Sequence, residues 1–252
     1  MAAETGIRGE TYRTESVEHT DLEAALAARI DGEVRFDSYS RELYATDASA
    51  YRRVPIGVVF PRGVDDVIAV MRYCADAQVA VLPRGGGTSL AGQAVNEAVV
   101  LDFTKHMAAV GPVDSDQQLV RAEAGVTLGR LNAHVAPTGL KFPPDPAWGD
   151  KSTLGGAIGN NSTGAHSLLY GKTDYYLEEV EAVLADGSTA TFGEMTIEQL
   201  REQADPEGSL LEQIHARVLG VLEEHAATIE SRYPDLKRNV SGYALDVLLQ
   251  EA

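Results

Sequence analysis

Cysteine is almost absent from the chain, and its position limits what it can do. Cys74 is the only cysteine among 252 residues. It lies in the segment DDVIAVMRYCADA, where apolar residues recur at helical spacing, so the sequence predicts a small buried thiol on a helix. A lone cysteine excludes an internal disulfide, and it excludes cysteine-rich zinc and iron–sulfur centres from this segment.

Basic residues are also scarce. The chain has 21 Lys and Arg against 38 Asp and Glu, which gives a formal net charge of -17. The lysines are Lys105, Lys141, Lys151, Lys172 and Lys237. So acidic a chain is repelled by nucleic acid and by anionic membranes, and neither is expected as a partner. The acidic residues are scattered, which is typical of a solvated surface and resembles proteins of a halophile with a high-salt cytoplasm.

Long apolar runs are missing as well. No stretch approaches the roughly 20 consecutive apolar residues of a membrane helix. The first residues, MAAETGIRGETYRTE, lack the basic start and apolar run of a signal peptide, so a cytoplasmic protein is expected. The histidines share no ligand spacing with carboxylates, so no metal site is expected. The hydrophobic fraction of 44% is enough for one large domain or two joined subdomains.

The apolar pattern of residues 46–108 predicts a small parallel sheet. An amphipathic helix is expected at 64–77. Buried strands are expected at 56–60, 79–83 and 98–103. Crossover connections of this length are typical of parallel strands, so this part is predicted to be an α/β subdomain.

The remaining chain divides into three parts. Residues 109–195 predict a second, mainly antiparallel α+β subdomain, because Asp186-Gly187 between apolar runs is a strong hairpin signal. Residues 1–45 are expected to form a helical segment. Residues 196–252 are expected to form a helical extension, because capping-box patterns precede its apolar stripe.

A glycine-rich loop, residues 83–93 (PRGGGTSLAGQ), follows the second predicted strand. Three consecutive glycines lose much backbone entropy on ordering, so a mere turn rarely uses them. The loop can aim several N–H groups at a pyrophosphate, while Thr88 and Ser89 add hydroxyls and Arg84 places a cation nearby. A Cβ at Gly86 would block that approach, and it would strain the backbone if φ there is positive.

Two other phosphate-binding loops do not match this segment. Residues 87–92 have the glycine spacing of a P-loop, but Gln93-Ala94 stands where Lys-Ser/Thr is required. The Rossmann fingerprint fails because Leu90 and Ala91 stand in place of its third glycine. Neither an NTPase nor a Rossmann NAD site is therefore expected.

A second long loop, rich in Gly, Pro and Asn, runs from residue 137 to 171. It contains FPPDP at 142–146 and STLGGAIGNNSTGAH at 152–166. Long loops inside compact domains are usually functional. Glycines permit close approach, and the Asn, Ser and Thr side chains offer the donors and acceptors that a flavin ring or ribityl chain needs.

With both loops in place, the chain resembles the FAD-linked oxidases of the vanillyl-alcohol oxidase and p-cresol methylhydroxylase family. It is most similar to D-lactate, glycolate and D-2-hydroxyglutarate dehydrogenases, especially the large forms fused to an iron–sulfur module. The resemblance runs from about Thr46 to Phe192, with a weaker match at 239–243. It implies an α+β, two-subdomain FAD-binding fold of the p-cresol methylhydroxylase type, with a small parallel piece, a larger mainly antiparallel piece and a helical tail.

The resemblance also implies a site for each part of FAD. The first loop would hold the pyrophosphate through Arg84, Gly85, Gly86, Gly87, Thr88 and Ser89, with Gly92 and Gln93 at its end. The second would lie against the isoalloxazine and ribityl parts through Pro144, Asp145, Thr153, Gly155, Gly156, Gly159, Asn160, Asn161 and Gly164. Covalent members attach flavin through a histidine beside the glycine loop, but this chain reads GGGTSL there, so noncovalent FAD is implied.

An activity is implied by the same resemblance. Hydride would leave the hydroxyl-bearing carbon of a small 2-hydroxy acid for the flavin, and an iron–sulfur domain or subunit would accept the electrons. A base in a later cap domain would take the hydroxyl proton, and the chain is expected to be a fragment or subunit that ends before that domain. No catalytic residue is assigned, because His166 is better explained by a hydrogen bond to the second loop.

Two alternatives stay open. One is a flavin-holding module without turnover of its own. The other is a relative of the NADPH-dependent reductase that acts on an enolpyruvyl sugar nucleotide, which shares the glycine loop. The segment RGGGTSLAGQ together with FPPDP favours the hydroxy-acid branch.

Overall fold

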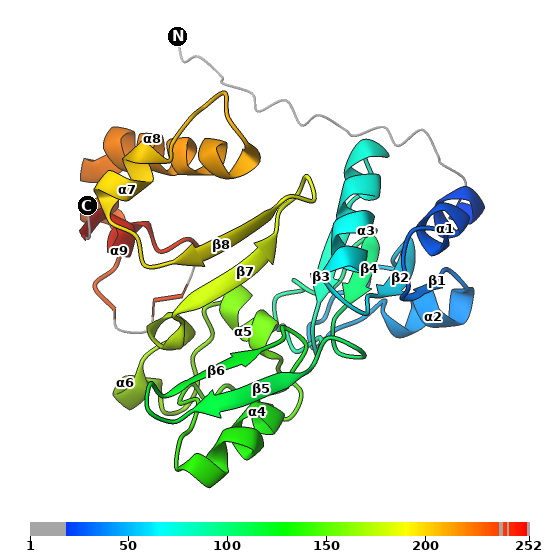
Figure 1. Cartoon of the computed structure of the whole chain (residues 1–252), viewed down its shortest axis with the longest axis horizontal. Coiled ribbons are helices and arrows are strands. Elements are labelled where there is room, and N and C mark those ends of the chain that lie inside the picture. Colours follow the sequence, from blue (N-terminus) through cyan, green and yellow to red (C-terminus); the bar gives the residue numbers. More distant parts are fainter. Residues whose placement is uncertain (1–18, 237–238, 241, 251–252) are drawn as a thin grey trace.

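The structure is a computed structural model that describes residues 19–236, 239–240 and 242–250 (Figure 1). Residues 1–18 of the predicted helical segment and Ser241 of the motif at 239–243 lie outside this part. The strands form one four-stranded sheet and two two-stranded sheets. The predicted α+β class is therefore confirmed.

The four-stranded sheet has the order β1-β2-β4-β3. Its strands are β1 (Glu33–Arg35), β2 (Gly57–Phe60), β3 (Val81–Arg84) and β4 (Val99–Asp102). The three predicted strands are present and parallel, whereas β1 adds an antiparallel edge beside β2. β1 interrupts the segment that the sequence predicts to be helical. A three-residue strand is too short to show an alternating pattern, which is why the sequence missed it.

Helices cover both faces of this sheet. α1 (His19–Ala27) and α3 (Val64–Asp76) pack on one face, and Cys74 of α3 is buried there as predicted. The other face, with Val58 and Val100, is covered by the segment around Tyr44, which follows α2 (Ser38–Leu43). Strands buried on both faces need continuous apolar runs, which explains the sequences of β2 and β4.

Two hairpins make up most of the second part. They are β5 (Val110–Asp114) with β6 (Leu119–Ala122), and β7 (Glu179–Val183) with β8 (Thr189–Gly193). α4 (Leu128–Val135) packs its apolar face on the first hairpin. The second hairpin turns at Gly187, with φ 76°, as predicted, and it contacts α3 of the first part.

The long second loop and the residues that adjoin its two ends carry short helices that the sequence did not predict. They are η1 (Ala136–Thr138), α5 (Leu154–Gly159), α6 (Ser167–Tyr170) and η2 (Thr173–Tyr176). The glycines of α5 hide its helical pattern, because glycine is a poor helix former.

The tail is helical, as predicted. It consists of α7 (Ile197–Glu202), α8 (Leu210–Arg232) and α9 (Leu245–Gln250). The predicted capping boxes at Thr196 and Ser209 are both present. α8 contacts α7 and α9, and Leu222 and Ile229 of its apolar stripe are buried. No helix in the described residues is long and apolar enough to cross a bilayer.

Candidate functional site

The glycine-rich loop lies where the parallel strands β3 and β4 end. Arg84, the last residue of β3, is in register with Asp102, the last residue of β4. Within the described part of the chain, the backbone N–H groups of residues 85–89 donate no hydrogen bond. Consecutive free amides in a glycine-rich loop are suited to an anion, because they offer several donors in one concavity.

The glycines of this loop have two different structural roles. Gly87 and Gly92 have φ angles of 63° and 79°, so both adopt the left-handed conformation that favours glycine. Gly86 is not among the residues with positive φ, so the conditional prediction of strain there does not apply. A Cβ on Gly86 would instead lie 1.9 Å from the carbonyl oxygen of Lys151. A Cβ on Gly85 would lie 2.1 Å from Thr153 Oγ1.

The two predicted loops are packed against each other and connected by side-chain contacts. Thr88 Oγ1 and Ser152 Oγ lie 3.3 Å apart, within hydrogen-bonding distance. At the far end of the first loop, Gln93 Nε2 donates to Asn160 Oδ1 at 3.2 Å. The residues that the sequence assigned to two parts of one cofactor site are therefore adjacent in the structure, although more than 60 positions separate them along the chain.

Arg84 does not extend from the loop as a free cation. Its guanidinium donates to the carbonyl oxygens of Tyr44 at 3.1 Å, Ala94 at 2.7 Å and Thr46 at 2.8 Å. Burial lowers the pKa of this group below its usual value, although nearby anionic groups oppose that effect. Arg84 is thus tied to backbone on both sides of the site.

Sequence reasoning missed the segment that lies under the loop. Ala48 N donates to the Gly87 carbonyl at 3.0 Å, and Asp47 Oδ2 accepts from Ala94 N at 3.2 Å. A Cβ on Gly92 would lie 2.6 Å from the Tyr51 ring. Nothing in the letters of residues 44–51 marks them as part of a site, because their role depends on tertiary packing.

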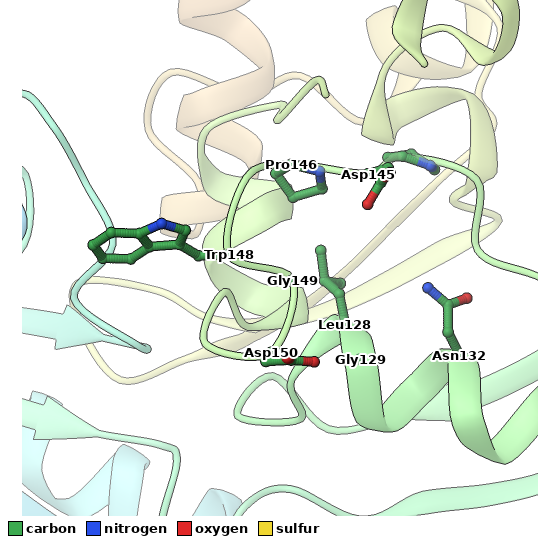
Figure 2. A pocket seen from close by; sticks show the side chains of 9 residues that line it. Leu128, Gly129, Asn132, Asp145, Pro146, Trp148, Gly149 and Asp150 are labelled. Carbon is green, nitrogen blue, oxygen red and sulfur yellow. The ribbon is translucent and has the colours of Figure 1, made fainter. Parts of the chain in front are cut away.

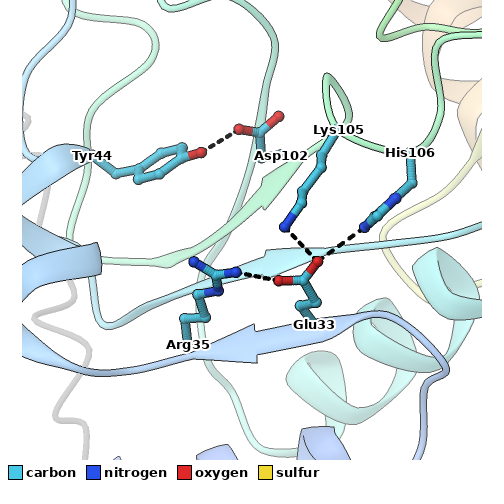
Figure 3. Close-up of polar contacts among 6 residues, drawn as sticks. All are labelled: Glu33, Arg35, Tyr44, Asp102, Lys105 and His106. Atoms are coloured by element: carbon cyan, nitrogen blue, oxygen red, sulfur yellow. Dashed lines mark hydrogen bonds and ion pairs between the residues drawn. The ribbon is translucent and has the colours of Figure 1, made fainter.

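A cavity of about 320 Å³ opens beside Gly85 and Gly86. It is lined by Leu43, Tyr44, Arg84, Gly85, Gly86, Asp102 and Thr104. The Tyr44 hydroxyl donates to the Asp102 carboxylate (Figure 3). Burial, followed by the hydrogen bond to Asp102, raises the pKa of Tyr44, so it stays protonated. Asp102 ends an apolar strand beside Arg84, a position from which it could have been predicted.

The second loop begins its contact with the first at Thr153, the N-cap of α5. The Thr153 side chain accepts from Gly156 N at 3.3 Å. The N–H groups of Leu154 and Gly155 donate to Val126 and Ala124, each at 2.8 Å. The start of α5 is therefore occupied by protein partners.

Other predicted residues of the second loop hold that loop together. Pro144 is buried. A Cβ on Gly164 would lie 1.7 Å from the Asp145 carbonyl oxygen. Asn161 exchanges two hydrogen bonds with Asp174, at 2.7 and 3.0 Å, with its own φ at 44°. Gly156, Gly159 and Asn160 are exposed, and nothing lies within 4 Å of a Cβ on Gly159.

His166 makes the expected hydrogen bond to this loop. Its Nδ1 lies 2.9 Å from Asp145 Oδ2, and both side chains are about half exposed. Asp145 also lines a second cavity of about 320 Å³, together with Asn132, Trp148 and Asp150 (Figure 2). Two carboxylates and no cationic side chain are found among the described residues that line it, so it is unsuited to a carboxylate group of a substrate.

A comparison with known families identifies the domain that carries these loops. The profile of a family described as an FAD binding domain matches residues 55–193, which include both loops. The chain belongs to this family, and FAD is its cofactor. The residues present fit that cofactor, because residues 85–89 offer free amides to a pyrophosphate and none of these five residues is buried.

Two curated relatives show which members of the family this chain is similar to. A D-2-hydroxyglutarate dehydrogenase of Pantoea ananatis is 34% identical over 90% of this chain and 22% of the relative. A D-lactate dehydrogenase of Archaeoglobus fulgidus is 39% identical over 56% of this chain and 31% of the relative. The chain thus spans less than a third of these relatives.

A solved structure supports the fold alone. The xylooligosaccharide oxidase of Myceliophthora thermophila has a TM-score of 0.59 at 21% identity, covering 68% of this chain and 37% of the oxidase. The predicted two-part FAD-binding fold, with parallel and antiparallel sheets, is confirmed by this likeness and by the sheet topology.

Proposed function

We propose that this chain is the FAD-holding part of an oxidoreductase that oxidises a small 2-hydroxy acid, with FAD bound noncovalently. The observation that carries the proposal is the row of free amides at residues 85–89, held against a second loop of the same site. The printed names of the relatives favour a hydroxy acid such as D-2-hydroxyglutarate or D-lactate.

In this proposal, the two loops divide the cofactor between them. The first loop takes the pyrophosphate through its amides and through Thr88 and Ser89. Residues 144–164 of the second loop lie against the ring and ribityl parts, and the predicted residues among them that are exposed to a ligand are Asp145, Gly156, Gly159 and Asn160. Domain boundaries near residues 45, 108 and 195 belong to the same proposal. The boundary near 108 separates the four-stranded sheet from the hairpins and the one near 195 separates the hairpins from the helical tail, whereas β1, before residue 45, pairs with β2 of the four-stranded sheet.

Bound flavin supplies the redox chemistry by accepting a hydride. The residues of this chain supply binding and orientation: the amides stabilise the phosphate charge by donating hydrogen bonds, and the contacts between the loops fix the distance between the two ends of the site. The acidic lining of the cavity beside Asp145 does not suit the substrate carboxylate, so we assign carboxylate recognition to another part of the protein. The proposal also includes an iron–sulfur electron acceptor in another domain or subunit. It includes a cytoplasmic location as well.

Reconstitution with FAD tests the proposal. We expect FAD to bind with retained flavin absorbance, ADP to compete with it, and riboflavin to compete poorly because it lacks the pyrophosphate. The yellow colour should pass into the supernatant on acid precipitation. Failure to retain any flavin would refute the site, and colour in the pellet would refute noncovalent binding. In protein that also contains the part that recognises the substrate carboxylate, anaerobic bleaching of bound flavin by D-2-hydroxyglutarate or D-lactate, but not by their L-enantiomers, would identify the substrate class.

A further inference from the structure

We propose that Arg84 is a positioning residue, which holds the glycine-rich loop in its open-amide conformation and does not itself bind the phosphates of the cofactor. This rests on the proposed function, because it assigns the pyrophosphate to the amides of residues 85–89. An arginine directly before a glycine-rich anion loop would ordinarily be taken for the counter-charge of the phosphate. The contacts of its side chain indicate a different role.

The guanidinium closes the loop at both ends. Arg84 begins the loop, and its Nη1 donates to the carbonyl of Ala94, the first residue after the loop, at 2.7 Å. The same Nη1 donates to the Tyr44 carbonyl at 3.1 Å, and Nη2 donates to the Thr46 carbonyl at 2.8 Å. One side chain therefore joins the start of the loop, its end and the segment beneath it.

The middle of the loop also depends on this group. A Cβ on Gly87 would lie 2.7 Å from Arg84 Nη2, so the guanidinium packs directly against the backbone there. Gly87 has a φ of 63°, and its carbonyl accepts from Ala48 N at 3.0 Å. Ala48 follows the segment that Arg84 holds, so the left-handed turn and the guanidinium are fixed by the same neighbours.

The donors of Arg84 are largely committed to these contacts. A guanidinium has five N–H donors, and both hydrogens of Nη1 and one of Nη2 are taken by backbone carbonyls. In the described part of the chain, Arg84 forms no ion pair at all, and its carbonyl partners are neutral. Lysine would keep the charge but could not reproduce a planar fork toward three carbonyls.

Two substitutions of Arg84 distinguish a positioning role from a role that depends only on its positive charge. Arg84→Lys keeps the charge and Arg84→Met removes it, while Arg41→Lys is a matched control, because Arg41 Nε also donates to a carbonyl, that of Pro55, at 2.8 Å. We expect both Arg84 variants to weaken FAD binding by about tenfold or more, and Arg41→Lys to keep the wild-type Kd. If Arg84→Lys keeps the wild-type Kd, the positioning role is wrong, whether or not Arg84→Met binds.

Hydrogen exchange without cofactor gives an independent readout. We expect the amides of Ala48 and Ala94, which hold the loop, to exchange faster in Arg84→Lys than in the wild type, while the amides of α3 keep their protection. A pure phosphate ligand would leave exchange in the cofactor-free protein unchanged, so unchanged rates would overturn the proposal. If the wild-type protein binds no FAD, the proposed function itself fails. If the wild type and Arg84→Lys bind FAD equally well, only the positioning role of Arg84 fails.

Should neither Arg84 variant fold, the wild-type protein decides the matter by NMR. The Arg84 side-chain nitrogen resonances should change little when FAD is added, whereas the amide resonances of residues 85–89 should shift. A large shift of the Arg84 side-chain resonances, of the kind produced by a direct phosphate contact, would overturn the positioning role.

Discussion

A methyl group at Gly86 should damage the site through the contact between the two loops. In Gly86→Ala the new Cβ would lie 1.9 Å from the Lys151 carbonyl oxygen, whereas ordinary contact begins near 3.4 Å. One backbone segment must therefore move by roughly 1.5 Å, and overpacking of this kind costs about 1–3 kcal/mol of folding stability. A shift of that size would also break one or two charge-assisted hydrogen bonds from the loop amides, which weakens FAD binding by about ten- to a hundredfold.

Calorimetric titration with FAD and thermal unfolding measure the two effects separately. Gly220→Ala is the control, because nothing lies within 4 Å of a Cβ there and alanine favours its helix, α8. The control should keep the wild-type Kd and melt at an equal or higher temperature. The reasoning is refuted if Gly86→Ala binds FAD as tightly as the wild type, since the loops would then not need to approach each other. The bulkier Gly86→Val should abolish binding.

Three other outcomes follow from charge and burial. Lys105, then Arg35 and His106, hold the pKa of Glu33 at about 2 instead of 4.5 (Figure 3), so its stabilisation is present above 4.5 and is lost as pH falls toward 2. In urea unfolding, the free energy of unfolding of Glu33→Gln should fall less over that pH range than that of the wild type. A variant with the same pH dependence as the wild type would contradict this. Burial raises the pKa of Cys74 to about 11, so a thiol reagent should label it only after unfolding. With a net charge of -17, the melting temperature should rise from dilute buffer to molar KCl, because the screening length falls steeply, from about 10 Å at 0.1 M to about 3 Å at 1 M ionic strength; a flat or falling series would remove the high-salt interpretation.

The sequence predicted those elements whose signal is local. The strands β2, β3 and β4 are continuous apolar runs, α3 has a helical apolar stripe, and the turn at Gly187 follows from Asp186-Gly187. Each of these can be recognised within a dozen residues. β1 and α5 could not, because one is three residues long and the other is built largely of glycine.

The site shows the same division. Both loops could be found from their glycines, since runs of glycine have few structural explanations other than close approach. The residues that these loops contact could not be predicted from the sequence. Gly85 and Gly86 are small because Thr153 and Lys151 lie against them, and these are contacts across more than 60 positions of chain. The segment at residues 44–51 gave no signal, because its contacts form only in the folded chain: backbone hydrogen bonds, the Asp47 carboxylate on Ala94 N and the Tyr51 ring beside Gly92.

An acidic chain that binds an anion needs donors whose strength does not depend on net charge. The loop meets this need with backbone amides, which cannot be titrated and which the fold holds in place before the ligand arrives. The one cation in its first turn, Arg84, is fixed by neutral carbonyls, so its field remains available to the site while its donors secure the loop. Scattered carboxylates can then cover the rest of the surface. The loop amides and Arg84, which favour phosphate, are held close to it, whereas the carboxylates that oppose it are spread over the surface and screened by salt.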